Sequence, residues 1–546
     1  MRSLALLLSL LGALQASAAP AAKDPRCRGA GPARAARFLT PGQPAAPAQL
    51  TAYAAACAQD SVVQLTSQLI RFRTVSSEVP AAKSPEIARM GAFLQGWAKR
   101  NGLAFRTVGQ NDVFELAWGE GPLQVGFVFH GDVVPAPAHE WKTKPFEPVV
   151  KDGKLYGRGA MDDKAPLAAV LTLIQLSNEL GLKPAGRVLV IVGNGEESDW
   201  TGMQAYAEKE PHPPHVISVD ANFPLVAAQS GFVGWALEAD AAPAAAPDSA
   251  GAADAGTPAP AARLRVTALS GGEFLTQVPG QAELTLLPVG MSAAQALAQV
   301  QANVAALAAE RPLMKVEVKR AGGSVRLVAR GVAVHSSVAE EGRNALWDLA
   351  AVASRLPLED GGAKAMLGLL ASHFDGDVWG QKLGLAYEDP LMGRLLVTAD
   401  LLRLEKGKVT LGINMRRPQG KDAAAFNASL DAAARRVAEA TGGRVHEGKG
   451  RYVGDPHVAD PSGPLVTTLL GIYRQQMSDP QAAPRSVRGG TYARLFPRAV
   501  DFGPDFPGDL YTGHAPDEFV SLERLDQLTR LLAGAMGAFA FTAPPK

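Results

Sequence analysis

The sequence predicts an α/β protein, with a mixed, largely parallel sheet flanked by helices and a second, α+β domain inserted into the first. Three observations lead to this fold class. Short apolar, β-branched runs at 123–129 and 187–192 enclose a long apolar helical stretch at 164–182, an order typical of helix-covered parallel sheets. From about residue 231, alternating strand patterns flank Ala-rich helical segments instead. Finally, 546 residues exceed what one core usually organises.

The N-terminal 49 residues are expected to lie outside the folded domains. Arg2 precedes an apolar run, Leu4 to Leu14, and Ala16-Ser17-Ala18 follows, so residues 1–18 resemble a secretory signal cleaved near Ala18. The Ala/Pro-rich stretch 19–49 is predicted to be a flexible leader. We therefore expect an exported protein, periplasmic or secreted.

The remaining chain is predicted to form one main domain in two parts, 50–230 and 418–546, around an inserted domain at 231–417. Within the inserted domain, residues 238–263 are almost wholly Ala, Pro, Asp, Gly and Ser, which predicts a low-complexity insertion loop. In the main domain, 86–101 has helical apolar spacing, and a C-terminal helix is expected to begin near Ser521.

Composition and net charge indicate which classes of binding partner the protein can have. Apolar residues make up 47% and charged residues 20%, as in ordinary folded proteins, and the formal net charge is +1. A balanced charge argues against a nucleic-acid partner, and no run beyond the signal approaches the roughly 20 apolar residues of a membrane span. We expect a small-molecule partner and no membrane insertion.

Cys27 and Cys57 are the two cysteines of the chain. An oxidising compartment would allow them to pair, and two unpaired thiols on a mobile arm are the alternative. Neither reading makes them catalytic or metal-binding.

Polar residues with metal-ligand chemistry stand at the ends of the predicted core elements. His130 ends the apolar run LQVGFVFH, and the carboxylate of Asp132 is placed to accept its second imidazole N–H. Asp162 lies in the turn GRGAMDDK, whose glycines allow close backbone approach, and a carboxylate there can bridge two cations. This edge of an α/β sheet is the usual position of a ligand site.

Further candidates follow along the chain. Glu196 and Glu197 are adjacent on a turn after the run VLVIV, so one can bind metal while the other transfers protons. Asp220 ends the run HVISVD, and His514 lies in YTGHAP near the C-terminus. Each residue alone is more often solvated or structural. As a set they indicate a metal site.

With these motifs the sequence resembles the dinuclear-zinc metallopeptidases of carnosinase, aminoacylase and carboxypeptidase G type, and most closely the PepV-like dipeptidases. The matching stretches are HGDVVP at 130–135, Trp141 with Pro145-Phe146, GRGAMDDK at 157–164, GEES at 195–198, DANFP at 220–224 and GGTY at 489–492. One departure is Ala165, where the family usually has Gly. The resemblance implies a zinc-peptidase catalytic domain with an inserted lid domain.

The resemblance also implies the roles of the metal ligands. Asp162 would bridge two divalent ions, most simply Zn²⁺, with Mn²⁺ or Co²⁺ as alternatives. His130 and Asp220 would hold one ion, and Glu197 and His514 the other. Glu196 is then free to act as general base on a metal-bridging water.

In the predicted lid, two side chains and one loop resemble family positions that contact the substrate. His335, in AVHSS, matches a histidine that stabilises the oxyanion. Arg416, in NMRRP, matches an arginine that grips the substrate carboxylate, with Arg417 as its rival. Gly489, Gly490 and Thr491 could offer backbone N–H groups to that carboxylate, or form an ordinary turn.

We therefore expect a metal-dependent exopeptidase, a dipeptidase acting on dipeptides or short peptides. An N-acyl amino acid hydrolase or a carboxypeptidase with the same dinuclear site is the enzymatic alternative, because lid loops choose the substrate. An inactive peptide-binding homologue is a third possibility. In PepV-like relatives the extended lid accompanies a monomer, so a monomer is expected here.

Overall fold

The structure is a computed structural model that describes residues 24–241 and 262–542. The chain divides into two compact units. The first combines the chain up to Pro214 with the C-terminal stretch from Leu510, and the second comprises His215–Asp509. The predicted signal segment 1–18, and residues 242–261 of the predicted insertion, lie outside the described residues.

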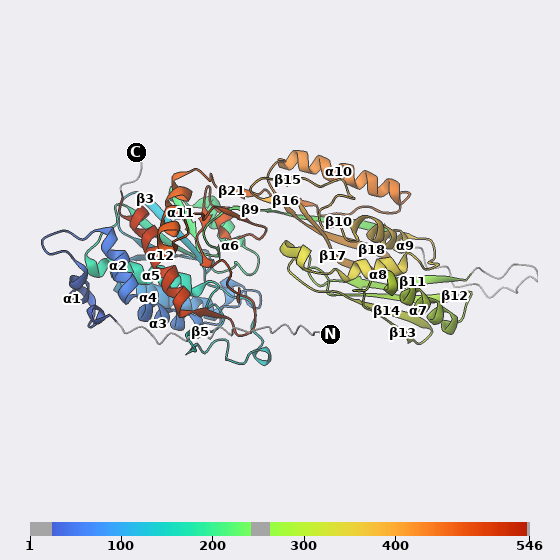
Figure 1. Cartoon of the computed structure of the whole chain (residues 1–546), viewed down its shortest axis with the longest axis horizontal. Helices are drawn as coiled ribbons and strands as arrows, with labels where there is room; N and C mark the ends of the chain where they lie inside the picture. Colours follow the sequence, from blue (N-terminus) through green and yellow to red (C-terminus); the bar gives the residue numbers. More distant parts are fainter. Residues whose placement is uncertain (1–23, 242–261, 543–546) are drawn as a thin grey trace, which may run out of the picture. The chain divides into compact units, whose positions relative to one another are not determined.

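The first unit, whose strand β3 is labelled in Figure 1, is built on four strands in the order β1-β2-β6-β3. β3 and β6 are parallel, as the strand–helix–strand pattern predicts, whereas β2 runs antiparallel to both β1 and β6. The α/β class with a mixed sheet is therefore confirmed. The strands are β1 (Ala104–Val108), β2 (Val113–Trp118), β3 (Leu123–His130) and β6 (Arg187–Gly193), with a small separate sheet of β4 (Val149–Lys151), β5 (Lys154–Tyr156) and β25 (Phe519–Ser521).

The central helix of this unit is α5 (Lys164–Leu180), which buries nearly every residue because apolar side chains occupy all of its faces. Gly181, in the left-handed conformation with φ 75°, ends it. The helices α2 (Pro47–Cys57), α3 (Gln59–Ile70) and α12 (Leu522–Ala540) pack against α5. The other helices are η3 (Ala81–Lys83), α4 (Pro85–Arg100), η4 (Ala138–Glu140) and α6 (Thr201–Lys209).

The prediction of a flexible leader is wrong for residues 24–49. This segment forms η1 (Pro25–Cys27), α1 (Gly31–Ala35), η2 (Ala36–Phe38) and the start of α2. Cys27 is joined to Cys57 by a disulfide, which decides the alternative that the sequence left open. Arg34 donates to the Tyr53 hydroxyl at 2.5 Å and to both carboxylate oxygens of Glu179 on α5 at 3.0 and 2.9 Å. These long-range contacts hold a segment whose composition alone predicts disorder.

The second unit contains two groups of strands. The first runs in the order β7-β23-β9-β21, with β22 parallel to β9. Its strands are β7 (His215–Ser218), β9 (Val226–Gln229), β21 (His457–Val458), β22 (Arg485–Val487) and β23 (Val500–Asp501), beside the short pair β8 (Ala221–Asn222) and β24 (Pro504–Asp505). The helices α11 (Pro464–Met477) and η7 (Tyr492–Leu495) accompany them.

The second group is an antiparallel sheet in the order β13-β14-β12-β11-β17-β18-β10-β19, with β20 also on β10. Figure 1 labels its strands β10 to β14, β17 and β18. Its strands are β10 (Gly231–Asp240), β11 (Arg263–Gly271), β12 (Gln281–Val289), β13 (Val316–Ala321), β14 (Ser324–Arg330), β17 (Leu396–Glu405), β18 (Lys408–Arg417), β19 (His446–Glu447) and β20 (Tyr452–Val453). β10 extends to Asp240, so the first residues of the predicted insertion are strand.

Helices cover one face of this antiparallel sheet and share its core. They are α7 (Ala293–Glu310), α8 (Ala345–Ala353), α9 (Gly362–Leu369), the π-helix η6 (Leu370–Phe374) and α10 (Ala423–Ala440). The unit also contains the short helix η5 (Ser336–Glu341) and a hairpin of β15 (Glu388–Asp389) and β16 (Gly393–Arg394). Phe426 and Leu430 of α10 are fully buried in that core. The predicted domain boundary at Arg417 therefore falls inside the packed core.

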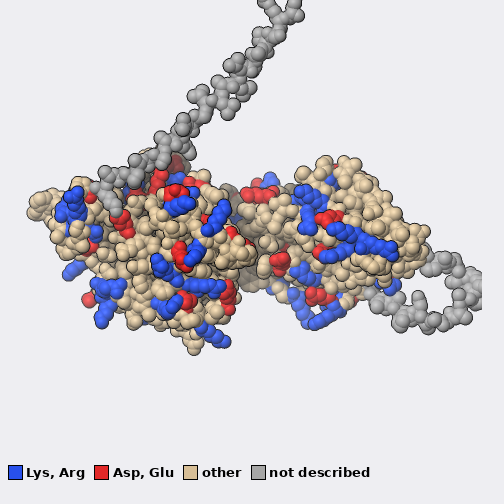
Figure 2. All heavy atoms as spheres, turned by 90° about the horizontal axis from the view of Figure 1, so that it is seen from below, with Lys and Arg blue, Asp and Glu red and all other residues tan. Residues whose placement is uncertain are grey.

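The surface carries both signs of charge. Figure 2 shows basic and acidic side chains interspersed over the visible face, as the net charge of +1 leads one to expect. Among the described residues, no helix combines the length and apolar character required to cross a bilayer.

Candidate metal centre

His130 is the last residue of β3 and is almost completely buried. Its Nδ1 lies 2.9 Å from the backbone carbonyl of Asp132. Because a carbonyl can only accept, Nδ1 is the protonated nitrogen of the neutral ring, and Nε2 presents a lone pair. Nε2 in turn faces Asp162 Oδ1 at 2.6 Å. Two electron-pair donors at this distance require a proton or a cation between them.

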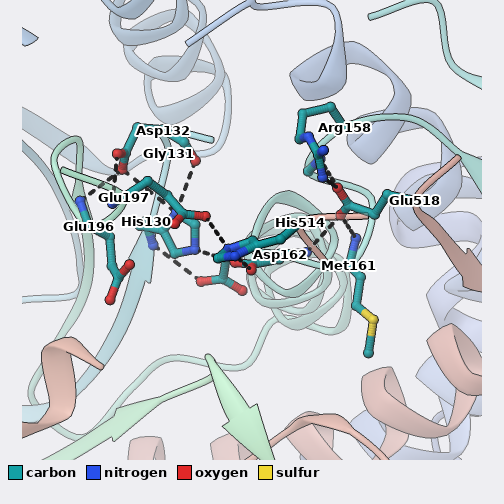
Figure 3. Close-up of polar contacts among 12 residues, drawn as sticks. His130, Gly131, Asp132, Arg158, Met161, Asp162, Glu196, Glu197, His514 and Glu518 are labelled. Carbon is teal, nitrogen blue, oxygen red and sulfur yellow. Dashed lines mark hydrogen bonds and ion pairs between the residues drawn. The ribbon is translucent and has the colours of Figure 1, made fainter. Parts of the chain in front are cut away.

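The turn that carries Asp162 is held by a buried carboxylate that the sequence analysis missed. Glu518 accepts hydrogen bonds from the backbone N–H groups of Gly159 (3.0 Å), Met161 (2.8 Å) and Asp162 (3.2 Å), and from Nη1 of Arg158 (2.7 Å) (Figure 3). Gly159 has φ 89°, and a Cβ there would lie 2.9 Å from the Lys164 side chain. The glycine and Glu518 together fix where the Asp162 carboxylate points.

Asp132 organises the other acidic turn, which follows β6. Its two carboxylate oxygens accept the backbone N–H groups of Glu196 and Glu197, both at 3.1 Å, and the hydroxyl of Ser76 at 2.5 Å. The predicted partner of this carboxylate was the imidazole of His130, but Nδ1 lies 3.7 Å from Asp132 Oδ1 and bonds to the carbonyl instead. The carboxylate therefore positions the two glutamates rather than the ring.

Glu197 and Glu196 leave this turn in different ways. Glu197 points toward His514, whose Nε2 lies 2.8 Å from Glu197 Oε1 and 3.2 Å from Asp162 Oδ2. In Figure 3 the Glu196 side chain extends away from the Asp132 carboxylate that its backbone contacts. The two adjacent acids thus have separate surroundings, which a division into ligand and base requires.

The close approach of carboxylates and imidazoles in this site shifts their pKa values. Burial opposes ionisation of Asp162, but His130 and His514 outweigh it and hold its pKa well below the usual range. Burial and the charge of Asp162 raise the pKa of Glu197. Burial lowers the pKa of His514, yet the two carboxylates prevail and raise it to about 11. The charge states of Asp162, Glu197 and His514 therefore depend on one another.

The donor set suits a divalent cation. Ligand atoms of His130, Asp162 and Glu197 lie within 4.8 Å of one another. Imidazole with carboxylates is the ligand chemistry of zinc, and manganese or cobalt also accept it. Metal binding requires neutral imidazoles and ionised carboxylates, so it is coupled to the release of protons. Tyr511, which the sequence analysis did not single out, donates its hydroxyl to Asp162 Oδ2 at 2.7 Å.

The other predicted residues belong to the second unit. Asp220 lies two residues after the end of β7 and is partly buried, and its role as a ligand stays a prediction. His335 precedes η5 and is exposed. The backbone N–H of Ser337 donates to His335 Nδ1 at 3.3 Å, so the neutral ring carries its proton on Nε2. That tautomer is the one able to donate to an oxyanion.

The two rival arginines of β18 have different partners. Arg417 Nη1 donates to the Gly454 carbonyl and to Asp455 Oδ1, both at 2.8 Å, and its Nη2 donates to the Lys421 carbonyl. Arg416 Nη2 donates to the Ser336 hydroxyl at 3.0 Å, and the buried Nε of each arginine has no partner among the described residues. With one hydrogen bond against three, Arg416 is the guanidinium that keeps more donors for a ligand.

Part of the hydrogen-bonding capacity of the loop at 489–491 is already used within the protein. The Thr491 N–H donates to Gln229 Oε1 at 3.0 Å, and its hydroxyl donates to Asp501 Oδ1 at 2.7 Å. This N–H was predicted to serve a substrate carboxylate, but it is already used. A Cβ built at Gly489 would meet nothing within 4 Å, so open space adjoins that residue.

Comparison with known proteins now identifies the class. The model of peptidase family M20/M25/M40 matches residues 126–538, more than half of the chain, and the chain belongs to this family. It is accordingly a metal-dependent peptide-bond hydrolase, as the resemblance predicted.

The chain is similar to several dipeptidases. It is 27% identical over 487 residues to a putative dipeptidase, YtjP, of Bacillus subtilis, a match covering 88% of this chain and 97% of the relative. It is 28% identical over 478 residues to a β-Ala-Xaa dipeptidase of Lactobacillus delbrueckii, covering 86% and 93%. Human carnosine dipeptidase 1 shares the fold, with a TM-score of 0.50, 15% identity, and coverage of 90% and 98%.

Proposed function

We propose that the enzyme is a dipeptidase that hydrolyses dipeptides or short peptides with two divalent ions, most simply Zn²⁺. Asp162 would bridge the ions, His130 and Asp220 would hold one, and Glu197 and His514 the other. The observation that carries the proposal is the convergence of His130, Asp162 and Glu197 beside Glu196. The similarity to named dipeptidases over most of both chains supports the substrate class.

When bound, such ions would lower the pKa of a water and polarise the scissile carbonyl. The Glu196 carboxylate takes the proton of the attacking water and delivers it to the leaving amine. Asp132 keeps this base and Glu197 in register, because both backbone N–H groups bond to its carboxylate. The buried Glu518 does the same for Asp162.

Residues of the second unit complete the proposed reaction. His335 donates its Nε2–H to the oxygen that becomes negatively charged as the carbonyl is attacked. Arg416 binds the C-terminal carboxylate of the substrate through those guanidinium N–H groups that make no hydrogen bond within the protein. The three hydrogen bonds of Arg417 to backbone carbonyls and Asp455 support the choice of Arg416 over its neighbour.

The substrate class is tested by comparing unblocked dipeptides with N-acetylated amino acids and longer peptides, at matched metal content. We expect turnover of the dipeptides. Activity confined to the acetylated amino acids would contradict the proposal in favour of an N-acyl amino acid hydrolase. Release of C-terminal residues from longer peptides alone would point to a carboxypeptidase.

We also propose that the enzyme is exported after cleavage near Ala18 and acts as a monomer. The Cys27–Cys57 disulfide supports an oxidising compartment, since cytosolic proteins rarely keep one. N-terminal sequencing of protein from fractionated cells tests the first point, with intact Met1 in the cytosol as the contrary result. Light scattering tests the second, with a stable dimer as the contrary result.

A further inference from the structure

A β-bulge interrupts β17, the strand that pairs with the strand of the substrate-binding arginine proposed above. In the β17–β18 ladder Ala399 pairs with Ile413, but Leu401 pairs with Gly412, so Asp400 is one extra residue on β17. Bulges of this kind redirect a side chain and are common beside active sites. Asn344 donates its amide to the Ala399 carbonyl at 2.7 Å, which fixes the displaced backbone.

The carboxyl group of Asp400 is completely buried. Its Oδ2 accepts the Thr398 hydroxyl at 2.6 Å, and its Oδ1 has no hydrogen-bond partner among the described residues. Thr398 pairs with Asn414, and Leu396 with Arg416, so Thr398 and Arg416 lie on the same face of the sheet. Its hydrogen bond to Thr398 therefore places this incompletely paired acid at the face that carries Arg416.

Arg416 is its complement in charge. The side chain is buried, its partner from η5 is the Ser336 hydroxyl, and its guanidinium lies 5.4 Å from the ring centre of Phe232 on β10. Two charged groups act on it electrostatically: Asp400 from β17 and Arg494 from η7. Asp400 is thus the acid that faces this cation, and Arg494 opposes it.

We propose that Asp400 is a positioning residue for Arg416, and that its protonation state sets how tightly the guanidinium holds the carboxylate of the substrate. The proposal rests on the proposed function, in which Arg416 binds that carboxylate. A protonated Asp400 leaves the full charge of Arg416 to the substrate. An ionised Asp400 neutralises part of it and repels a second carboxylate, so the substrate binds more weakly.

Burial makes this change of state accessible near neutral pH. Burial raises the pKa of Asp400 to about 8, although Thr398 and Arg416 act in the opposite direction. Burial lowers the pKa of Arg416 to about 10, and Asp400 opposes that shift. Linkage is reciprocal, so a substrate carboxylate that prefers the protonated form must bind less tightly once Asp400 ionises. Coupling of about one pKa unit corresponds to about a tenfold change in affinity.

The test compares wild type with Asp400→Asn, which keeps the shape of the protonated acid but cannot ionise. The KM for alanylalanine is measured from pH 6.5 to 9.5, and the ratio of the two KM values is taken at each pH. Titrations at the metal centre are common to both proteins and cancel in the ratio. We expect the ratio, wild type over variant, to rise from about 1 to about 10. A ratio that stays constant would overturn the proposal.

Two further variants separate this effect from a structural one. Asp348→Asn alters another buried acid of the same unit, which pairs with Arg343 at 2.8 Å, and it should follow the wild-type pH dependence. Thr398→Val removes a bond that lowers the pKa of Asp400, so the rise in KM should move to higher pH. The proposal would be contradicted if the KM of Asp348→Asn did not change with pH, or if the rise in KM of Thr398→Val occurred at the same pH as in wild type.

Calorimetry measures substrate binding directly, so it tests the role of Asp400 without relying on catalytic turnover. The Kd of alanylalanine and of its C-terminal amide is measured in a Glu196→Gln background, with and without Asp400→Asn. We expect the tenfold pH-dependent ratio for the free carboxylate and a ratio near 1 for the amide. Equal ratios for both ligands would refute the role of Asp400. Absence of hydrolysis by metal-loaded wild type would refute the dipeptidase proposal alone.

Discussion

Replacing Glu518 by Gln tests how the bridging position of Asp162 is maintained. The carboxylate receives three backbone N–H groups and Arg158 Nη1, and the side chains of the ion pair are 0% and 2% exposed. An amide has one accepting oxygen, so its NH₂ group would face donors. Breaking one partner of a buried ion pair costs about 3 to 5 kcal/mol. Loss of a group that orients a metal ligand typically weakens metal binding 10- to 100-fold.

The assay for Glu518→Gln combines two measurements. Thermal unfolding reports stability, and competition with a fluorescent chelator reports the Kd for zinc. Glu147→Gln is the matched control, because Glu147 forms an exposed ion pair with Lys144, worth at most about 1 kcal/mol. Zinc affinity within twofold of wild type, together with an unchanged unfolding midpoint, would refute the reasoning.

Three other outcomes are expected. Glu196→Gln should lower kcat by about 10²- to 10⁴-fold while metal content stays at the wild-type value, and retained turnover would remove Glu196 as the base. Replacing Cys27 and Cys57 by Ser should lower the free energy of unfolding by about 3 to 4 kcal/mol, since the bridge spans 30 residues, with little change in kcat; an unaltered denaturation midpoint would contradict this. Burial raises the pKa of Asp501 from 3.8 to about 6, so this acid favours the folded state most below pH 3.8 and loses that contribution as pH rises through 6. Asp501→Asn should therefore gain about 2.4 kcal/mol relative to wild type between pH 4 and pH 7 in urea unfolding, and a pH-independent difference would be the contrary result.

Local patterns in the sequence predicted the elements that carry the metal centre. The apolar run that ends at His130 is β3, and the long apolar stretch after Asp163 is α5. These predictions succeed because strand and helix periodicity, and a glycine-rich turn, are encoded within a few residues. The family resemblance added the separate roles of the adjacent Glu196 and Glu197, which spacing alone left open.

What the sequence did not predict depends on contacts between distant segments. Glu518 reaches a turn more than 350 residues earlier, and nothing around it distinguishes it from a solvated acid. Arg34 is likewise ordered by Glu179, far along the chain. The bulge at Asp400 requires the pairing register of two strands, which no single strand contains. The one local signal that was missed is the HAPDE stretch, in which Glu518 follows His514 by four residues.

Metal dependence is the central claim, and one experiment tests it most directly. The protein is purified without added metal, its metal content is measured, and dipeptide hydrolysis is followed before chelation, after chelation and after re-addition of Zn²⁺, Mn²⁺ or Co²⁺. We predict two ions per chain in the active protein, loss of activity when they are removed, and recovery when they are restored. Full activity in the metal-free protein would contradict the mechanism.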